Sequence, residues 1–177
     1  MTINPVFNIM QWFGDNKEEM APPVGNKMVY NDEDWIVMAV AGPNARNDYH
    51  FHERGPEWFM QVKGNMILKI MQEDGPVDIK IREGEMFMMP RSTIHSPQRP
   101  EGTWGIVLEA HAKGTERDWL YYYCDNCNNK LGQFEFKLKN IVTELPPIMA
   151  QFWDGDMKTC DKCGHVQEKP NPPKPYE

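Results

Sequence analysis

Apolar and polar residues alternate in short runs over much of the chain before residue 115, and most runs end at glycine or proline. The stretches 66–71 and 79–81 alternate on either side of a turn, which predicts a β-hairpin. The almost wholly apolar stretch 35–40 predicts a strand buried on both faces. Further strands are expected at 84–89 and 103–109. Short strands with turn signals between them favour a barrel or sandwich, so the expected fold class is all-β.

Helical spacing is confined to two stretches. Asn8 can cap a short N-terminal helix that runs to Met20 and is ended by Pro22-Pro23. A second helix is expected after Pro146-Pro147, where apolar residues recur at helical intervals.

The composition changes after Gly114, where aromatic residues lead into the first of two cysteine pairs. With 177 residues, the chain suits one domain of ordinary size plus an appendage. We expect a catalytic barrel at 1–115, a metal-binding extension at 116–168 and a proline-rich tail at 169–177.

The charge of the chain excludes several classes of partner. A formal net charge of −7 and a pI near 5.3 disfavour nucleic acid and anionic membranes as partners. The sequence contains neither an apolar run long enough to span a bilayer nor a signal-peptide pattern at its start. We therefore expect a cytoplasmic protein whose partner is a small molecule.

The stretch around residues 50–64 carries the clearest candidate chemistry. On a strand, His50 and His52 leave the same face, and Glu57 returns toward them after a Gly55-Pro56 turn. His95 is the expected third partner, on another strand that faces the first. Two imidazoles and one carboxylate suit a first-row divalent ion and leave positions open for substrate and oxygen. The candidate ligands are therefore His50, His52, Glu57 and His95, and whether two or all three of the imidazoles bind the ion stays open.

Two Cys-x-x-Cys pairs form a second candidate metal site. Four thiolates, from Cys124, Cys127, Cys160 and Cys163, would fill a tetrahedral shell, so the expected role is structural, with zinc or iron. Residues 116–177 carry eight Lys/Arg against ten Asp/Glu, which disfavours a nucleic-acid-binding zinc ribbon.

Two arginines lie close in sequence to the histidines, and one carboxylate lies on a further strand. Arg46 lies four residues before His50, and Arg99 lies four residues after His95. Glu109 ends an apolar strand, where a carboxylate needs a partner or a function. A divalent metal, two cationic clamps and one base predict a pocket for an anionic small molecule that chelates the metal.

The pattern His-x-His-x4-Glu-x6-Gly, followed by Gly-x5-Pro-x4-His, resembles the two motifs of the cupin superfamily of double-stranded β-helix (jelly-roll) barrels. Within it, the chain resembles the 3-hydroxyanthranilate 3,4-dioxygenase family, in its short microbial form with a C-terminal four-cysteine metal site. The resemblance rests on Pro22-Pro-Val-Gly-Asn26, Gly42-Pro-Asn44, Asp48-Tyr-His50, Glu57-Trp-Phe59, His95-Ser-Pro-Gln-Arg-Pro100, Tyr123-Cys124 and Cys160-x-x-Cys-Gly-His165.

This resemblance implies that His50, Glu57 and His95 bind catalytic ferrous iron, and that the protein is a homodimer. It implies that Arg46 and Arg99 hold the substrate and oxygen, while Glu109 takes a proton from the substrate. The implied product is 2-amino-3-carboxymuconate semialdehyde, which closes to quinolinate on the route to NAD. Three alternatives stay open: a related ortho-aminophenol carboxylate as substrate, a thiol dioxygenase or sugar isomerase, and a non-catalytic cupin that binds a metabolite.

Overall fold

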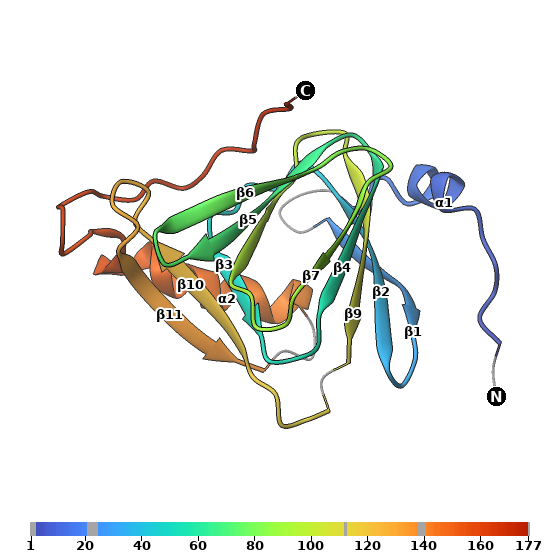
Figure 1. Ribbon diagram of the computed structural model, residues 1–177, viewed down its shortest axis with the longest axis horizontal. Coiled ribbons are helices and arrows are strands. Elements are labelled where there is room, and N and C mark those ends of the chain that lie inside the picture. Colours follow the sequence, from blue (N-terminus) through green and yellow to red (C-terminus); the bar gives the residue numbers. More distant parts are fainter. Residues whose placement is uncertain (1–2, 21–24, 112, 138–140, 177) are drawn as a thin grey trace.

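Two antiparallel sheets that face each other form the body of the protein (Figure 1). The computed structural model describes residues 3–20, 25–111, 113–137 and 141–176. In this part of the chain, one sheet has five strands in the order β1-β2-β9-β4-β7, and the other has six in the order β11-β10-β3-β8-β5-β6. The predicted all-β barrel is confirmed.

Each strand is short and ends near a turn. The five-stranded sheet consists of β1 (Asn26–Asn31), β2 (Trp35–Ala41), β4 (Glu57–Lys63), β7 (Met86–Met89) and β9 (Trp104–Ala110). The six-stranded sheet consists of β3 (Tyr49–His52), β5 (Met66–Gln72), β6 (Gly75–Ile81), β8 (His95–Gln98), β10 (Asp118–Tyr123) and β11 (Lys130–Phe136). The predicted hairpin is present as β5 and β6, whereas β1 has no counterpart among the predicted strands.

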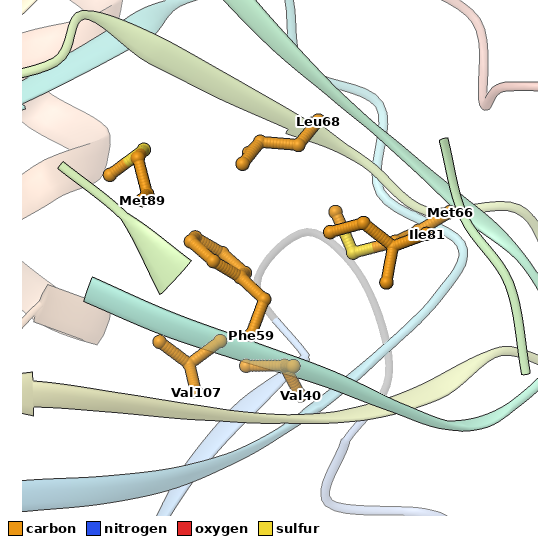
Figure 2. Close-up of a cluster of buried hydrophobic side chains, with 7 residues drawn as sticks. All are labelled: Val40, Phe59, Met66, Leu68, Ile81, Met89 and Val107. Atoms are coloured by element: carbon orange, nitrogen blue, oxygen red, sulfur yellow. The ribbon is translucent and has the colours of Figure 1, made fainter. Parts of the chain in front are cut away.

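The main hydrophobic core lies between the two sheets (Figure 2). Phe59 of β4 is at its centre, with Val107 of β9 on one side and Leu68 of β5 facing it from the other sheet. The remaining buried members are Val40, Met66, Ile81 and Met89. Burial of these side chains supplies the main driving force that keeps the sheets together, at about 1.5–3 kcal/mol for each large apolar side chain.

The helix α1 (Ile9–Asp15) covers part of the outer face of the five-stranded sheet. As predicted, the Asn8 side chain caps it, accepting a hydrogen bond from the Gln11 N–H. The helix ends at Asp15 and not at Met20, and it is held by Phe13, whose ring stacks on Trp104 at 5.0 Å. The predicted stop at Pro22-Pro23 lies outside the described residues.

A second helix, α2 (Ile141–Asp154), packs against the end of the six-stranded sheet that carries β10 and β11. The prediction that this helix begins after Pro146-Pro147 is wrong, because both prolines lie inside it. Packing against the sheet stabilises the helix: Phe152 stacks on the fully buried Tyr122 of β10, with ring centroids 3.7 Å apart. A short 3-10 turn, η1 (Asp156–Lys158), leads from α2 to the second cysteine pair.

The C-terminal tail lies along the hairpin of β5 and β6. The Tyr176 hydroxyl donates to the Met66 carbonyl at 2.6 Å, and the Asn65 side chain donates to the Tyr176 carbonyl. Strand β10 pairs with β3, so one sheet spans the proposed boundary at residue 115, and that division into domains stays a prediction. None of the helices among the described residues has the length and apolarity to cross a bilayer.

Candidate functional site

Strand β3 holds two of the candidate metal ligands on one face. His50 and His52 are two residues apart on this strand, so both side chains point between the sheets. His50 is also paired directly with His95 of β8. The prediction that His95 lies on a strand facing the first is therefore wrong, because the two strands are neighbours in the same sheet.

The carboxylates come from the opposite sheet. Glu57 of β4 and Glu109 of β9 are direct cross-strand partners, and both side chains point inward. Two carboxylates directly opposite each other repel, so this register is costly unless a cation lies beside it. The facing histidines and the arginines described below are the cationic and metal-ligating groups that the fold supplies there.

The donor atoms converge in two overlapping groups. One nitrogen from each of His50, His52 and His95 lies within 4.8 Å of the other two. The same limit holds for a second group formed by His52, Glu57 and Glu109. His52 belongs to both groups, which places it closer to the centre of the site than the predicted ligand set assumed.

The contact between His95 and Glu57 fits a metal ion. The Nδ1 atom of His95 donates to the Thr93 carbonyl at 3.0 Å, which leaves Nε2 as the nitrogen that can offer a lone pair to a metal ion. That nitrogen lies 3.2 Å from Glu57 Oε2, a buried oxygen without a hydrogen-bond partner. Two lone pairs at this distance need a cation beside them, either a proton on the imidazole or a metal ion, and a nitrogen with a carboxylate oxygen is a donor pair that first-row divalent ions accept.

Arg46 is held beside His50 by a residue that the sequence interpretation missed. The Arg46 guanidinium donates to both oxygens of Asp48, at 2.9 and 2.5 Å, and also contacts His50 Nε2. The Asp48 side chain is fully buried, and although burial acts to raise its pKa, Arg46 and His50 hold that pKa well below its usual range. Burial, followed by the charge of Arg46, lowers the pKa of His50 to about 4, so its imidazole is neutral at neutral pH.

The two inward carboxyl groups differ in their electrostatic surroundings. Burial acts to raise the pKa of Glu57, but His95 outweighs it, so that the pKa is lowered. Burial raises the pKa of Glu109 and outweighs the opposing charge of His52. Glu57 is thus suited to remain an anionic ligand, and Glu109 is suited to exchange a proton.

Arg99 is buried and is close enough to Glu57 for the two charges to interact. Its Nη1 donates to Gln61 Oε1 at 2.6 Å, and burial lowers its pKa to about 10. Gly105 makes room for it, because a Cβ there would lie 2.7 Å from Nη1 and 2.5 Å from the Gln61 oxygen. No ion pair to Arg99 occurs among the residues that the structure describes, so its charge is available to an anionic ligand.

A cluster at the end of β3 was also missed. His52 Nδ1 donates to Asp118 Oδ1 at 2.8 Å, and Arg54 Nη2 donates to both Asp118 oxygens at 2.9 Å. Asp118 lies opposite His52 in the register of β10 and β3. The alternation of residues along β10 could have predicted that Asp118 and Leu120 share a face. That Asp118 contacts His52 is shown only by the pairing of β10 with β3.

The four cysteines form a second, separate cluster. The Cys124 and Cys163 sulfurs are 3.6 Å apart, and those of Cys127 and Cys160 are 3.7 Å apart. A tetrahedron with metal–sulfur bonds of about 2.3 Å has edges of about 3.8 Å, so the arrangement fits a tetrahedral thiolate site.

Both cysteine turns have the same backbone pattern. The residue four positions after the first cysteine of each turn donates its N–H to that cysteine's carbonyl, at 2.9 Å. These residues are Asn128 and Gly164, which have φ of 57° and 73°, a conformation that asparagine and glycine adopt most readily. The second pair follows η1 and is tied to the first by Gln167, whose side chain donates to the Tyr123 carbonyl.

Comparison with known proteins identifies the family. Residues 1–153 match the model of the family described as 3-hydroxyanthranilic acid dioxygenase. A Xanthomonas euvesicatoria pv. vesicatoria protein named 3-hydroxyanthranilate 3,4-dioxygenase is 44% identical over 167 residues, covering 94% of this chain and 94% of that protein. A protein of the same name from Jannaschia sp. is 42% identical over 169 residues, covering 94% and 93%.

Among solved structures, a cupin-2 domain containing protein from Shewanella frigidimarina is similar, with a TM-score of 0.47 and 19% identity, covering 60% of this chain and 95% of that one. The match of the family model over most of the chain, together with relatives above 40% identity, confirms the resemblance predicted from the sequence. The chain belongs to the 3-hydroxyanthranilic acid dioxygenase family of enzymes.

Proposed function

We propose that the protein cleaves the ring of 3-hydroxyanthranilate with O2, giving 2-amino-3-carboxymuconate semialdehyde. Both oxygen atoms enter the product, so no external reductant is needed. The observation that carries the proposal is the contact of His95 Nε2 with Glu57 Oε2, an oxygen with no hydrogen-bond partner in the described part of the chain, beside Glu109 and the buried cation Arg99. The family membership of the chain supports the same activity.

We assign His50, Glu57 and His95 as the ligands of a ferrous ion. Two imidazoles and one carboxylate leave coordination positions for an ortho-aminophenol and oxygen. When bound, the iron supplies the one-electron chemistry that lets O2 react with an aromatic ring. The four cysteines hold a second ion, zinc or iron, which stabilises the fold.

Arg99 binds the ring carboxylate of the substrate. A buried guanidinium that forms no ion pair with any described carboxylate matches a planar anion, which it can bind through two hydrogen bonds. Fixing the carboxylate orients the ring and thereby selects the bond that is cut.

Glu109 accepts the proton of the ring hydroxyl. Its carboxylate is buried, and its raised pKa brings it closer to the range in which a carboxylate acts as a base near neutral pH. Loss of that proton raises the electron density of the ring and prepares it for reaction with oxygen.

Arg46 supplies positive charge beside His50. Because Asp48 holds the guanidinium in place, its position does not depend on the substrate, and it can stabilise negative charge that develops as the ring and oxygen react.

We further propose a homodimer and a cytoplasmic location. An outer groove of about 540 Å³ on the five-stranded sheet is lined mainly by apolar residues, among them Tyr30, Met60 and Ile106. Met86 and Met88, on the neighbouring strand, are 63% and 58% exposed, a suitable surface for a second copy. Ferrous iron and four thiols both favour a reducing compartment.

The proposed activity can be tested directly. The protein is loaded anaerobically with ferrous iron, mixed with 3-hydroxyanthranilate and then exposed to air, while oxygen uptake and the absorbance of the product are followed. One oxygen should be consumed for each substrate. No uptake with an occupied iron site would contradict the proposal and favour a metabolite-binding protein. Faster turnover of another ortho-aminophenol carboxylate would change the proposed substrate but not the proposed reaction.

A further inference from the structure

Arg54, in the turn between β3 and β4, reaches into the site without being one of its predicted members. One terminal nitrogen, Nη2, donates to both oxygens of Asp118, at 2.9 Å each. The other, Nη1, lies 3.7 Å from Glu109 Oε1. The two side chains are shielded from solvent to a similar extent, with 14% of Arg54 and 13% of Glu109 exposed.

The distance to Glu109 leaves that carboxylate open for chemistry. At 3.7 Å the two groups attract each other, but they are too far apart for a hydrogen bond. Arg54 can therefore orient the Glu109 carboxylate without occupying the lone pairs that the proton transfer requires. A direct bidentate pair would have blocked them.

Asp118 fixes Arg54 from the side of β10. The same carboxylate also accepts from His52 Nδ1, and it is the cross-strand neighbour of His52. Arg54 is thus attached to a strand and not only to its own turn. This attachment restricts the motion of the Arg54 side chain, because turn residues are usually more mobile than strand residues.

We propose that Arg54, anchored by Asp118, is a positioning residue that holds the Glu109 carboxylate in the orientation needed to accept the substrate's proton. The proposal rests on the proposed function, since it assumes that Glu109 acts as the base. It adds a residue for which the sequence interpretation had no role.

A double-mutant cycle tests whether Arg54 acts through Glu109. Arg54→Met, Glu109→Gln and the double variant are compared with the wild type by single-turnover oxygen consumption, together with kcat, KM and Tm. Arg54→Met should lower kcat about 10- to 100-fold, the range for residues that orient groups at a site, with a smaller change in KM. In the Glu109→Gln background the same substitution should have almost no further effect, because residues that act as a unit are not additive.

Two further variants separate positioning from folding. Arg54→Lys keeps the charge and should recover part of kcat. Arg82→Met removes the arginine of an exposed ion pair with Glu85, 3.6 Å long, and should leave kcat unchanged.

Equal losses from Arg54→Met in the wild-type and Glu109→Gln backgrounds would overturn the inference, as would a lowered Tm with unchanged kcat. In either case an active wild type leaves the proposed function standing. A wild type that takes up no oxygen would overturn both.

Discussion

The barrel site and the four-cysteine site differ in how the chain delivers their donors. The barrel site gathers its donors from strands in both sheets, at positions as distant as His50 and Glu109. The cysteine site uses two short turns with the same backbone hydrogen bonds, after Tyr123 and Thr159. One site depends on the register of the whole barrel, and the other mainly on local turn geometry.

The two sites also differ in how their polar atoms are satisfied. The barrel site places two carboxylates side by side, leaves Glu57 Oε2 without a hydrogen-bond partner and buries Arg99. The cysteine site consists of four alike donors at the spacing of a filled tetrahedron. Groups left unsatisfied by the protein require a ligand, whereas a complete shell leaves no position for one. This difference supports our proposal that the chemistry takes place in the barrel and that the cysteines stabilise the fold.

The comparison is most directly tested at Glu57. Glu57→Ala should remove the ion from the barrel and lower the activity by more than about 1,000-fold, because the metal chemistry is lost with it. The ion in the cysteine site should stay. Metal analysis per chain and oxygen uptake measure the two effects, and an unchanged metal content would exclude Glu57 as a ligand.

Cys160→Ser tests whether the metal in the four-cysteine site stabilises the fold. Loss of a structural metal should lower the free energy of unfolding by more than about 4 kcal/mol, seen as a lower Tm. Activity should also fall, because β10 runs from Asp118 at the barrel site to Tyr123, beside the first cysteine. Lys162→Ala, an exposed change in the same turn, is the matched control. A normal Tm in Cys160→Ser would contradict a stabilising role.

Asp48→Asn examines the buried charges of the barrel. Leaving Arg46 without its carboxylate should cost about 3–5 kcal/mol of stability at neutral pH. Because the pKa of Asp48 is lower in the folded state, its contribution is present above its unfolded pKa, about 4. It is lost as the pH falls below that value, so the difference in unfolding free energy should shrink on acidification. Denaturant unfolding of both proteins at several pH values measures this, and a pH-independent difference would contradict it.

Arg99→Ala gives the smallest expected effect and tests whether the Arg99 guanidinium binds the substrate carboxylate. A lost hydrogen bond to a charged group is worth about 1.5–3 kcal/mol, so kcat/KM for 3-hydroxyanthranilate should fall about 10- to 150-fold. Simple 2-aminophenol, which has no carboxylate, should lose much less. Equal losses on both compounds would show that Arg99 supports the site without binding the carboxylate.

Local patterns predicted the parts of the site that depend on local geometry. A two-residue period placed His50 and His52 on one face, and the spacing of the cysteines predicted their cluster. The role of Asp118 could not be predicted, because it arises from the pairing of β10 with β3, and strand order is a property of the whole sheet. The same holds for the neighbour relation of His95 to His50.

Tertiary packing also overrode one local signal in the fold, and one strand gave no clear signal. Pro146 and Pro147 usually mark the start of a helix, yet α2 extends ahead of them, packed through Phe152 on Tyr122. The edge strand β1 escaped prediction because its burial follows no simple alternation, and its pairing with β2 is interrupted by an irregularity after Met28.

Gly105 has a consequence for the range of molecules that the barrel can admit. A methyl group in place of its hydrogen would collide with the Gln61 oxygen and the Arg99 guanidinium, which would have to move apart. If Arg99 binds the acid group of the substrate as proposed, alanine or a larger residue at this position should displace the guanidinium and weaken the preference for acidic compounds. Replacing this glycine would then shift the enzyme toward uncharged phenols.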